Sequence, residues 1–355
     1  MKKLIKLLTC LMLACVSAFA LTACGGDPDD GGNNPPPHTH EYTTVTEYFD
    51  GVLERFPKTL KCSCGETSTK TAMEVTTADQ LMAISRYINE GDHYCYKIAI
   101  LNDIDMTGLS WTPIDIEVDD TRKVYEFTGA EGGVKIKNVT STAYSEGGLF
   151  GQVSTKLTVK NITIEDSSFT ATNTGAFAGF IDGTNEVKFI NCGVNNCTIN
   201  GSASAGALYG TAHTYDSSDR LVITVTAPVI TNNTINGTGY VGGLAGRATS
   251  CLSAKPEYSI SLTVTDWTFS GNNCYAINSE EQNIAGCVFG LLGNGKIQIP
   301  EVGNDILASN SAYLNTVKVE GREYGRTDWT SRDTEGLYMN GIAMLHYDGN
   351  GVVNS

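Results

Sequence analysis

Two pairs of potential metal ligands stand near the start of the sequence. The first pair is His38 and His40, and the second is Cys62 and Cys64. Two imidazoles and two thiolates form the donor set of a tetrahedral Zn²⁺ site, and so short a segment needs such a site because its own core is too small. Segment 38–72 is therefore predicted to be a small Cys/His module with structural zinc. The Cys-x-Cys spacing is tighter than usual, which leaves open an exposed redox pair or residues without a ligand.

The densest group of acidic side chains is followed by two basic residues. It consists of Asp115, Glu117, Asp119 and Asp120, then Arg122 and Lys123. Oxygen ligands at such a spacing could bind Ca²⁺. A solvated surface loop between two structural repeats has the same composition, and we expect the loop.

The other candidates for chemistry stand alone in the sequence. Asp348-Gly349-Asn350-Gly351 begins like a calcium loop but lacks the later ligands, so a turn is expected. His93 and His213 have no nearby partner for nucleophilic or metal chemistry. The sequence has no phosphate loop, nucleotide fingerprint or zinc-protease motif. We predict no catalytic residue.

The N-terminus has the pattern of an export signal. Residues 1–6 are basic, and residues 7–20 are apolar but too short to cross a bilayer as a helix. The next residues, Leu21-Thr22-Ala23-Cys24-Gly25, resemble the lipobox of bacterial lipoproteins, where cleavage precedes a cysteine that carries diacylglycerol. An ordinary signal peptide that contains a cysteine is the alternative. We expect a lipoprotein signal peptide at 1–23 and lipidation at Cys24.

The residues that follow predict where the chain lies. Segment 24–37 is rich in Gly, Asn, Asp and Pro and cannot pack, so it is expected to be a flexible tether. An acylated Cys24 would hold the protein on a membrane. The predicted location is extracytoplasmic and lipid-anchored to the cell membrane, or to the outer membrane in a Gram-negative cell.

The charge balance disfavours nucleic acid as a partner. The chain has 24 Lys and Arg against 39 Asp and Glu, a formal net charge of −15, whereas phosphate binding requires clustered basic residues. Only 18% of the residues are charged and 38 are Gly. This composition favours β structure with many turns.

Repetition explains most of the remaining sequence. A pattern of Gly, small, apolar, aromatic or small, and Gly occurs five times, and insertions fall between the copies. Its glycines are Gly147, Gly151, Gly175, Gly179, Gly206, Gly210, Gly242, Gly246, Gly286 and Gly290. They suit tight corners, where a side chain would clash or φ must be positive.

A second pattern follows the first, with two apolar residues five positions apart. The pairs are Ile164 and Phe169, Val194 and Ile199, Ile230 and Ile235, and Phe269 and Cys274. Two patterns that keep the same phase place equivalent residues above one another, at the roughly 4.8 Å separation of neighbouring strands. Like strands joined by such long connections must be parallel, so the sequence predicts a parallel β-helix.

Polar and sulfur-containing residues also recur in this pattern. Asn161 and Asn191 share one column, and Asn196 and Asn232 share another, which predicts amide ladders at turns or solvated turn residues. Several cysteines after the module are expected to be small buried hydrophobes, because their spacing shows no disulfide framework. These cysteines are Cys95, Cys192, Cys197, Cys251, Cys274 and Cys287.

The five-residue pattern resembles the GLUG motif of bacterial surface proteins. Earlier segments match further landmarks of these proteins, although Glu131 and Gly132 replace the usual aromatic residue and Asn. These segments are Thr76–Leu81, Asn102–Met106, Trp111–Ile114 and Phe127–Asn138. The resemblance implies an all-β, right-handed parallel β-helix over residues 74–320, in which Asp103 and Asp105 shape a turn. Residues 321–355 are expected to fold back as a closing element.

A helix is expected to cover the first coil of this β-helix. It should span Ala78–Asn89, with Thr77 as N-cap and Gln80 as its capping-box partner, and Gly91 should end it. Leu81, Ile84 and Ile88 should form its buried face. Such a helix would cover strand edges that are otherwise unpaired.

The fold alone leaves several functions open. β-Helices present long ladders to solvent that suit extended glycans or proteins, and the sequence shows no convergent acid/base set. We therefore expect a non-enzymatic adhesion or binding module for an extracellular glycan or protein. The alternatives are a β-helix polysaccharide lyase or glycoside hydrolase, and a spacer that displays the Cys/His segment. The acidic balance disfavours anionic glycans unless Ca²⁺ bridges them.

Overall fold

The computed structural model divides into two compact units, one drawn from Met1–Val45 and Thr59–Thr69 and the other from Thr46–Lys58 and Lys70–Ser355. The residues that the structure describes are 42–43, 58–62, 66–70, 72–91, 96–116, 124–183, 185–216, 219–249, 260–277, 284–293, 295–298, 309–314, 317–318, 324–325, 335–339 and 344–348. The first unit contains a three-stranded sheet, and its strands in order are β1 (Tyr42–Thr43), β2 (Lys58–Cys62) and β3 (Thr67–Lys70).

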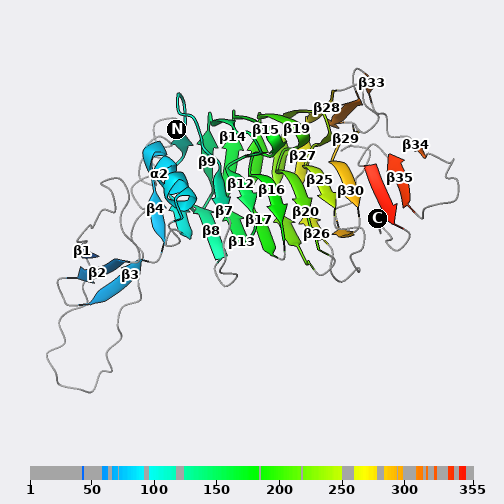
Figure 1. The fold of residues 1–355 in the computed structure, drawn as a ribbon. Helices are drawn as coiled ribbons and strands as arrows, with labels where there is room; N and C mark the ends of the chain where they lie inside the picture. The colour runs from blue at the N-terminus through cyan, green and yellow to red at the C-terminus, as the bar shows by residue number, and fades with distance from the viewer. Residues whose placement is uncertain are drawn as a thin grey trace, which may run out of the picture. The chain divides into compact units, whose positions relative to one another are not determined.

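The second unit is a stack of coils, and a full coil crosses four sheets in the same order (Figure 1). We name the sheets A to D in the order in which the chain visits them. Strands of neighbouring coils pair in parallel in every sheet. The chain is thus all-β and forms a parallel β-helix, as the repeats predicted.

Sheets A and B carry the first two strands of each coil. Sheet A contains, in spatial order, β4 (Met73–Val75), β5 (Lys97–Ile100), β8 (Val124–Gly129), β13 (Lys156–Lys160), β17 (Glu186–Ile190), β21 (Val222–Thr226), β26 (Ile260–Thr265) and β31 (Gly295–Gln298). Sheet B contains β6 (Ile104–Asp105), β9 (Val134–Lys137), β14 (Ile162–Glu165), β18 (Gly193–Asn195), β22 (Val229–Thr231) and β27 (Thr268–Ser270).

Sheets C and D carry the rest of each coil. Sheet C contains β10 (Thr140–Thr142), β15 (Ser168–Thr174), β19 (Thr198–Gly206), β23 (Thr234–Gly237), β28 (Asn273–Ala276), β32 (Ser311–Leu314) and β33 (Val317–Lys318), with the short strands β11 (Glu146–Gly147), β24 (Tyr240–Gly242) and β29 (Ile284–Gly286) beside them. Sheet D contains β7 (Ile114–Ile116), β12 (Phe150–Val153), β16 (Ala178–Asp182), β20 (Tyr209–His213), β25 (Ala245–Thr249), β30 (Phe289–Gly293), β36 (Met344–Asp348), β35 (Glu335–Met339) and β34 (Tyr324–Gly325).

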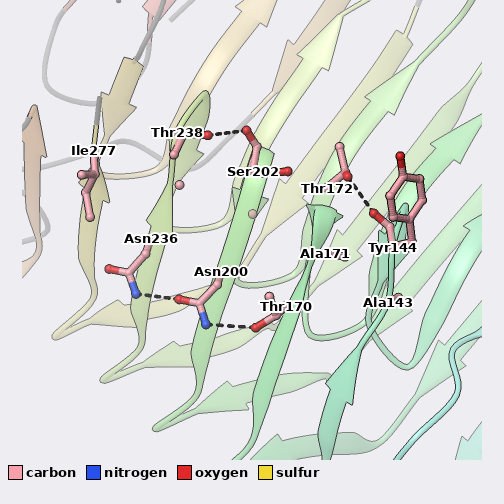
Figure 2. A pocket seen from close by; sticks show the side chains of 12 residues that line it. Ala143, Tyr144, Thr170, Ala171, Thr172, Asn200, Ser202, Asn236, Thr238 and Ile277 are labelled. Atoms are coloured by element: carbon pink, nitrogen blue, oxygen red, sulfur yellow. Dashed lines mark hydrogen bonds between the residues drawn. The ribbon is translucent and has the colours of Figure 1, made fainter. Parts of the chain in front are cut away.

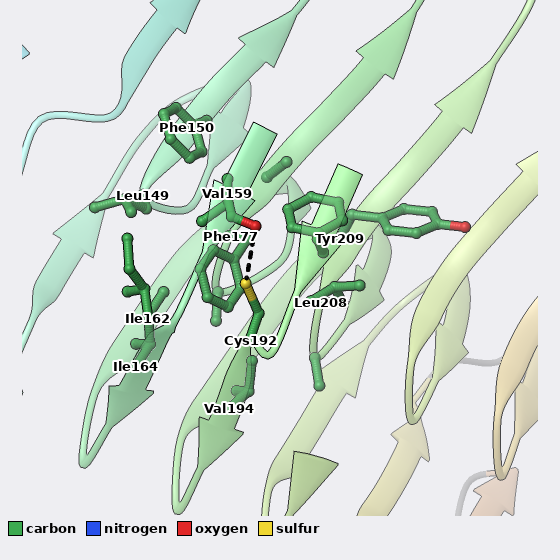
Figure 3. Packing of buried hydrophobic residues seen from close by; sticks show 14 of the residues in the cluster. Leu149, Phe150, Val159, Ile162, Ile164, Phe177, Cys192, Val194, Leu208 and Tyr209 are labelled. Carbon is green, nitrogen blue, oxygen red and sulfur yellow. Dashed lines mark hydrogen bonds between the residues drawn. The ribbon is translucent and has the colours of Figure 1, made fainter. Parts of the chain in front are cut away.

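The predicted apolar columns form the core of the β-helix. Ile164, Val194, Ile230 and Phe269 are in register on sheet B, and Phe169, Ile199, Ile235 and Cys274 on sheet C. All are buried. Leu149, Phe177 and Leu208, from the glycine pattern, lie in the same core (Figure 3). Burial raises the pKa of the Cys192 and Cys197 thiols to about 12, so these two cysteines act as buried hydrophobes.

Two corners of each coil require a residue with positive φ. The first column of such residues is Asn161, Asn191, Ala227 and Asp266, and the second is Asn138, Asp166, Asn196, Asn232 and Gly271. Asn and Asp tolerate this conformation better than other side chains do. The predicted ladder between Asn191 Nδ2 and Asn161 Oδ1 is present at 3.1 Å. Asn196 and Asn232 share a column as predicted, but their side chains bond elsewhere: Asn196 donates to Asp166, and Asn232 donates to Asn195.

The repeated glycines form arches where the chain turns from sheet C into sheet D. A Cβ at Gly175 would lie 2.4 Å from the Tyr209 Cα, and one at Gly210 would lie 2.4 Å from the Thr174 N. None of these motif glycines has positive φ. Of the two reasons expected for them, steric clash is therefore confirmed and positive φ is wrong. Gly147 also pairs with Thr174, one residue before Gly175, so the first arch departs from the repeat.

Helix α2 (Ala78–Asn89) lies at the N-terminal end of the stack, as predicted (Figure 1). Its N-cap is Thr77, whose side chain accepts a hydrogen bond from Gln80 N. The reciprocal bond differs from the expected capping box, because Gln80 Oε1 accepts from Thr76 N at 2.7 Å. Asn89 Nδ2 ties the helix to the first coil by donating to Pro113 O.

A column of asparagine side chains runs inside the β-helix at the corner before sheet C. Asn233, Asn272 and Asn310 are almost completely buried. Asn233 Nδ2 donates to Asn272 Oδ1, and Asn272 Nδ2 donates to Asn310 Oδ1, both at 2.8 Å. Each of these amides also donates to a backbone carbonyl of the preceding coil, at Val194 and Ile230. The ladder satisfies polar groups in the interior and holds neighbouring coils in register.

The C-terminal strands continue sheet D. Strand β36 pairs in parallel with β30, with Leu291 opposite Met344. Strands β35 and β34 follow in antiparallel order. Segment 321–355 thus adds strands next to β30.

Candidate functional site

The residues predicted to bind zinc are only partly described. Cys62 is buried at the end of β2, opposite Tyr42 of β1. His38, His40 and Cys64 lie outside the described residues, as does the predicted lipidation site Cys24. Structural zinc and lipidation therefore remain predictions. Within the described part of the chain, no group of three or more His, Cys, Asp or Glu side chains is placed to hold a metal ion.

Of the acidic cluster singled out in the sequence, the structure describes Asp115, whose carboxylate helps to join neighbouring coils. Asp115 Oδ1 accepts a hydrogen bond from Gln152 N in the next coil. Glu117, Asp119, Asp120, Arg122, Lys123 and His93 lie outside the described residues, and so do the three residues after Asp348. Asp348 itself ends strand β36. The predicted calcium-like loops therefore contribute no site to the described structure.

Asp103 and Asp105 shape a turn, as expected. Asp105 Oδ1 accepts hydrogen bonds from Thr107 N and from Asn138 Nδ2. These bonds, led by the one from Asn138, lower the pKa of Asp105 to about 2. Asp103 Oδ1 accepts from Lys135 N in the next coil. Both carboxylates therefore help to hold neighbouring coils together.

A shallow, open groove with a volume of about 550 Å³ runs across the outer face of sheet C (Figure 2). It crosses successive coils, so its length follows the axis of the β-helix. The groove is lined by Ala143, Tyr144, Thr170, Ala171, Thr172, Asn200, Gly201, Ser202, Asn236, Gly237, Thr238 and Ile277. Tyr144, which is 96% exposed, lies at one end, and Ile277, which is 56% exposed, lies at the other.

Two polar columns border the middle of the groove. In the first, Asn236 Nδ2 donates to Asn200 Oδ1 at 2.9 Å, and Asn200 Nδ2 donates to Thr170 Oγ1 at 3.2 Å (Figure 2). The second column contains Thr172 and Thr238, whose hydroxyls donate to carbonyls of the preceding coil. Ladder bonds use one donor and one acceptor of the central Asn200 amide, so its second N–H and second oxygen lone pair can still serve a ligand.

Small residues keep the groove open between these columns. Ala171, Gly201, Gly237 and Ala276 are in register, and none carries a side chain larger than a methyl group. The strands also bend here, since the register of β15 against β19 shifts between Ala171 and Asn173. The groove has no Asp, Glu, Lys, Arg or His in its lining. It is therefore suited to an elongated, uncharged ligand rich in hydroxyl groups.

His213, which appeared isolated in the sequence, has close neighbours in the structure. Its ring lies 4.9 Å from the Tyr215 ring, edge to face. Its Nδ1 lies 2.8 Å from Thr249 O in the next coil, and Asp182 is its register partner in the preceding one. The sequence was interpreted only for nucleophilic and metal partners of His213, and it did not predict this set of contacts. Sequence reasoning missed it because the parallel register brings together residues more than thirty positions apart.

The comparisons with known proteins leave the family of this chain open. No protein-family model matches the sequence, and no curated protein matches it. A solved structure, described as that of a candidate immunoglobulin A1 protease from Bacteroides ovatus, is similar to this protein. The match covers 67% of the present chain and 87% of the chain in that structure. The two are 18% identical, with a TM-score of 0.30. This likeness says nothing about the activity of the present protein.

No helix among the described residues is both long enough and apolar enough to cross a membrane.

Proposed function

We propose that the protein is a surface lipoprotein whose β-helix binds an extended, neutral glycan in the groove on sheet C. The observation that carries this proposal is the ladder of Thr170, Asn200 and Asn236, which repeats one polar group per coil along an uncharged groove. Parallel strands repeat every 4.8 Å or so, a distance close to the length of one hexose unit in an extended chain. Amides and hydroxyls can donate to and accept from sugar hydroxyls.

Charge and aromatic character support the same ligand class. A net charge of −15 does not oppose a neutral polymer, and Tyr144 offers an exposed ring at one end of the groove. An aromatic face contributes apolar contact area at little entropic cost. Adhesion to a glycan-bearing surface would follow from such binding, with the lipid anchor holding the protein on its own cell.

Removing the Tyr144 ring is expected to weaken glycan binding about tenfold, which corresponds to about 1.4 kcal/mol. Tyr144→Ala should not disturb the fold, because the hydrogen bond that Tyr144 accepts is made by its backbone carbonyl. The ectodomain would be tested for retention on immobilised neutral plant, mucin and bacterial polysaccharides. Val229→Ala, at an exposed position on sheet B, is the matched control.

Two kinds of result would contradict this function. One is equal retention of the Tyr144→Ala variant and the wild type, or retention of neither. The other is the appearance of new reducing ends or unsaturated products during incubation with and without Ca²⁺, which would favour the lyase or hydrolase alternative.

The lipid anchor has its own test. Cys24→Ser should move the protein from the membrane fraction to the soluble extracytoplasmic fraction, because serine lacks the thiol that carries the diacylglyceryl group. Cys15→Ser changes a cysteine within the leader and should leave the protein on the membrane. Unchanged fractionation of the Cys24→Ser variant would refute lipidation at Cys24.

A further inference from the structure

A second group of side chains converges on the outer face of sheet D. Asp182 on β16, His213 on β20 and Thr249 on β25 are in register, and Arg247 lies two residues before Thr249. Tyr215 follows the end of β20. We call Asp182, His213, Tyr215 and Arg247, together with Phe180 on β16, the aromatic shelf. It contains charged, polar and aromatic groups, whereas the groove on sheet C is uncharged.

Tyr215 provides the flat surface of the shelf. Its ring stacks with that of Phe180 at 6.2 Å between centroids and 23° between planes. The His213 ring meets it edge-on at 88°. Despite these contacts, Tyr215 remains 59% exposed, and within the described residues its hydroxyl makes no hydrogen bond. Two neighbouring rings therefore hold a large aromatic surface in contact with solvent.

His213 presents an acceptor to the same face. A carbonyl oxygen can only accept, so the 2.8 Å contact with Thr249 O places the proton of the neutral ring on Nδ1. Nε2 then carries the lone pair, and it has no partner among the residues that the structure describes. Burial and the neighbouring Arg247 charge lower the pKa of His213, so the ring is neutral near pH 7.

Arg247 and Asp182 present further fixed groups. Arg247 Nε donates to Thr249 Oγ1 at 2.8 Å, and its guanidinium lies over the Tyr240 ring. Its terminal Nη groups have no hydrogen-bond partner in the described structure. Asp182 accepts from Ser154 Oγ at 2.6 Å and from Gln152 Nε2 at 3.2 Å. These bonds fix the carboxylate and leave lone pairs on both oxygens.

We propose that the aromatic shelf is a second binding site, which takes a single neutral sugar residue. The sugar ring would pack on Tyr215, while its hydroxyls donate to His213 Nε2 and Asp182 and accept from Arg247. Two carboxylates, Asp182 and Glu146, and one guanidinium, Arg247, act electrostatically on Tyr215, so their charges give no net attraction for the carboxylate of an acidic sugar. This inference rests on the proposed glycan-binding function and adds a site for an end or a branch of the glycan.

Methyl glycosides of glucose, galactose and mannose serve as probes, titrated into the intact ectodomain and followed by NMR chemical shifts. At least one should bind, and Tyr215→Ala should weaken its affinity tenfold or more. Tyr144→Ala should leave this affinity unchanged while it weakens retention of the polymer. The two proposals can fail independently. If Tyr144→Ala does not weaken retention of the polymer, the groove proposal fails, but the proposed site on the aromatic shelf is unaffected.

The role of His213 has a separate readout. Affinity for the glycoside should fall as the pH drops below the pKa of His213, because protonated Nε2 no longer accepts a hydrogen bond. Among the described residues, the charged and titratable groups that act on His213 or on the adjoining Tyr215 are Asp182, Glu146, Arg247 and Tyr215 itself. His213→Gln, which keeps an acceptor, should bind with a flatter pH profile. Absence of glycoside binding by the wild type, or unchanged binding by Tyr215→Ala, would overturn the proposed site.

Discussion

Replacing Asn272 with alanine is expected to lower the free energy of unfolding by roughly 3 kcal/mol or more. The Asn272 side chain is completely buried and makes bonds in two directions. Its oxygen accepts from Asn233 Nδ2, and its amide donates to Ile230 O and Asn310 Oδ1. Alanine would remove the bonds made by Asn233 N, Asn233 Nδ2 and Ile230 O, whereas Asn310 Oδ1 would keep its bond from the backbone N of residue 272. Each buried group that loses its partner costs about 1–3 kcal/mol.

Chemical denaturation of the ectodomain, followed by circular dichroism, measures this loss. The matched control is Asn273→Ala, one residue further along the chain. Asn273 is half-buried, and its Nδ2 makes only a long 3.5 Å bond to Gly271 O, so we expect a change under about 1 kcal/mol. Equal destabilisation by the two substitutions would show that the interior ladder is not the source of the effect.

The interior ladder was not predictable from the repeats, although the apolar columns were. An apolar residue has one reason to recur at the same phase, which is burial, so Ile164, Val194 and Ile230 were aligned correctly. Asparagine has two reasons. Asn232 occupies a corner with positive φ, whereas Asn233, the next residue, points inside. In the coil before Asn233, the ladder position is occupied by Cys197, whose backbone N donates to Asn233 Oδ1. Because the residue type in this column changes between coils, the column cannot be recognised as a repeat in the sequence.

The sequence predicted that the β-helix has solvent-facing ladders, but it did not predict which residues lie together on each outer face. Loops of different length separate the coils, so the distance along the chain from Asp182 to His213 differs from that between His213 and Thr249. No fixed spacing marks residues that share a face, and their types vary because no common burial constrains them. The groove could have been anticipated in part, since Ala171, Gly201 and Gly237 follow the predicted apolar column two residues later. The parallel register was needed to show that they line up.

Replacing Gly210 with alanine should destabilise the β-helix by about 1–3 kcal/mol, as overpacking does. The new Cβ would meet backbone atoms, namely Thr174 N at 2.4 Å, Gly179 O at 2.7 Å and Asn173 C at 2.9 Å. Backbone atoms cannot move aside as a flexible side chain can, so the arch must widen. Gly210 lies between Gly179 and Gly246 in its column, and a wider arch at this position would strain the coils on both sides.

Asparagine at the same position distinguishes the steric reason from a conformational one. If Gly210 were required for positive φ, Gly210→Asn would be much less harmful than Gly210→Ala, because Asn tolerates that conformation. Since the constraint is close backbone approach, we expect Gly210→Asn to lower the melting temperature at least as much as Gly210→Ala. Gly183→Asn is the control: Gly183 has a φ of +75° and nothing within 4 Å of an added Cβ, so it should accept Asn with little change. Rescue by Asn at position 210 would contradict the steric account of the glycine repeat. The same result would mean that the arches select glycine for its backbone freedom and not for the close approach of backbone atoms from neighbouring coils.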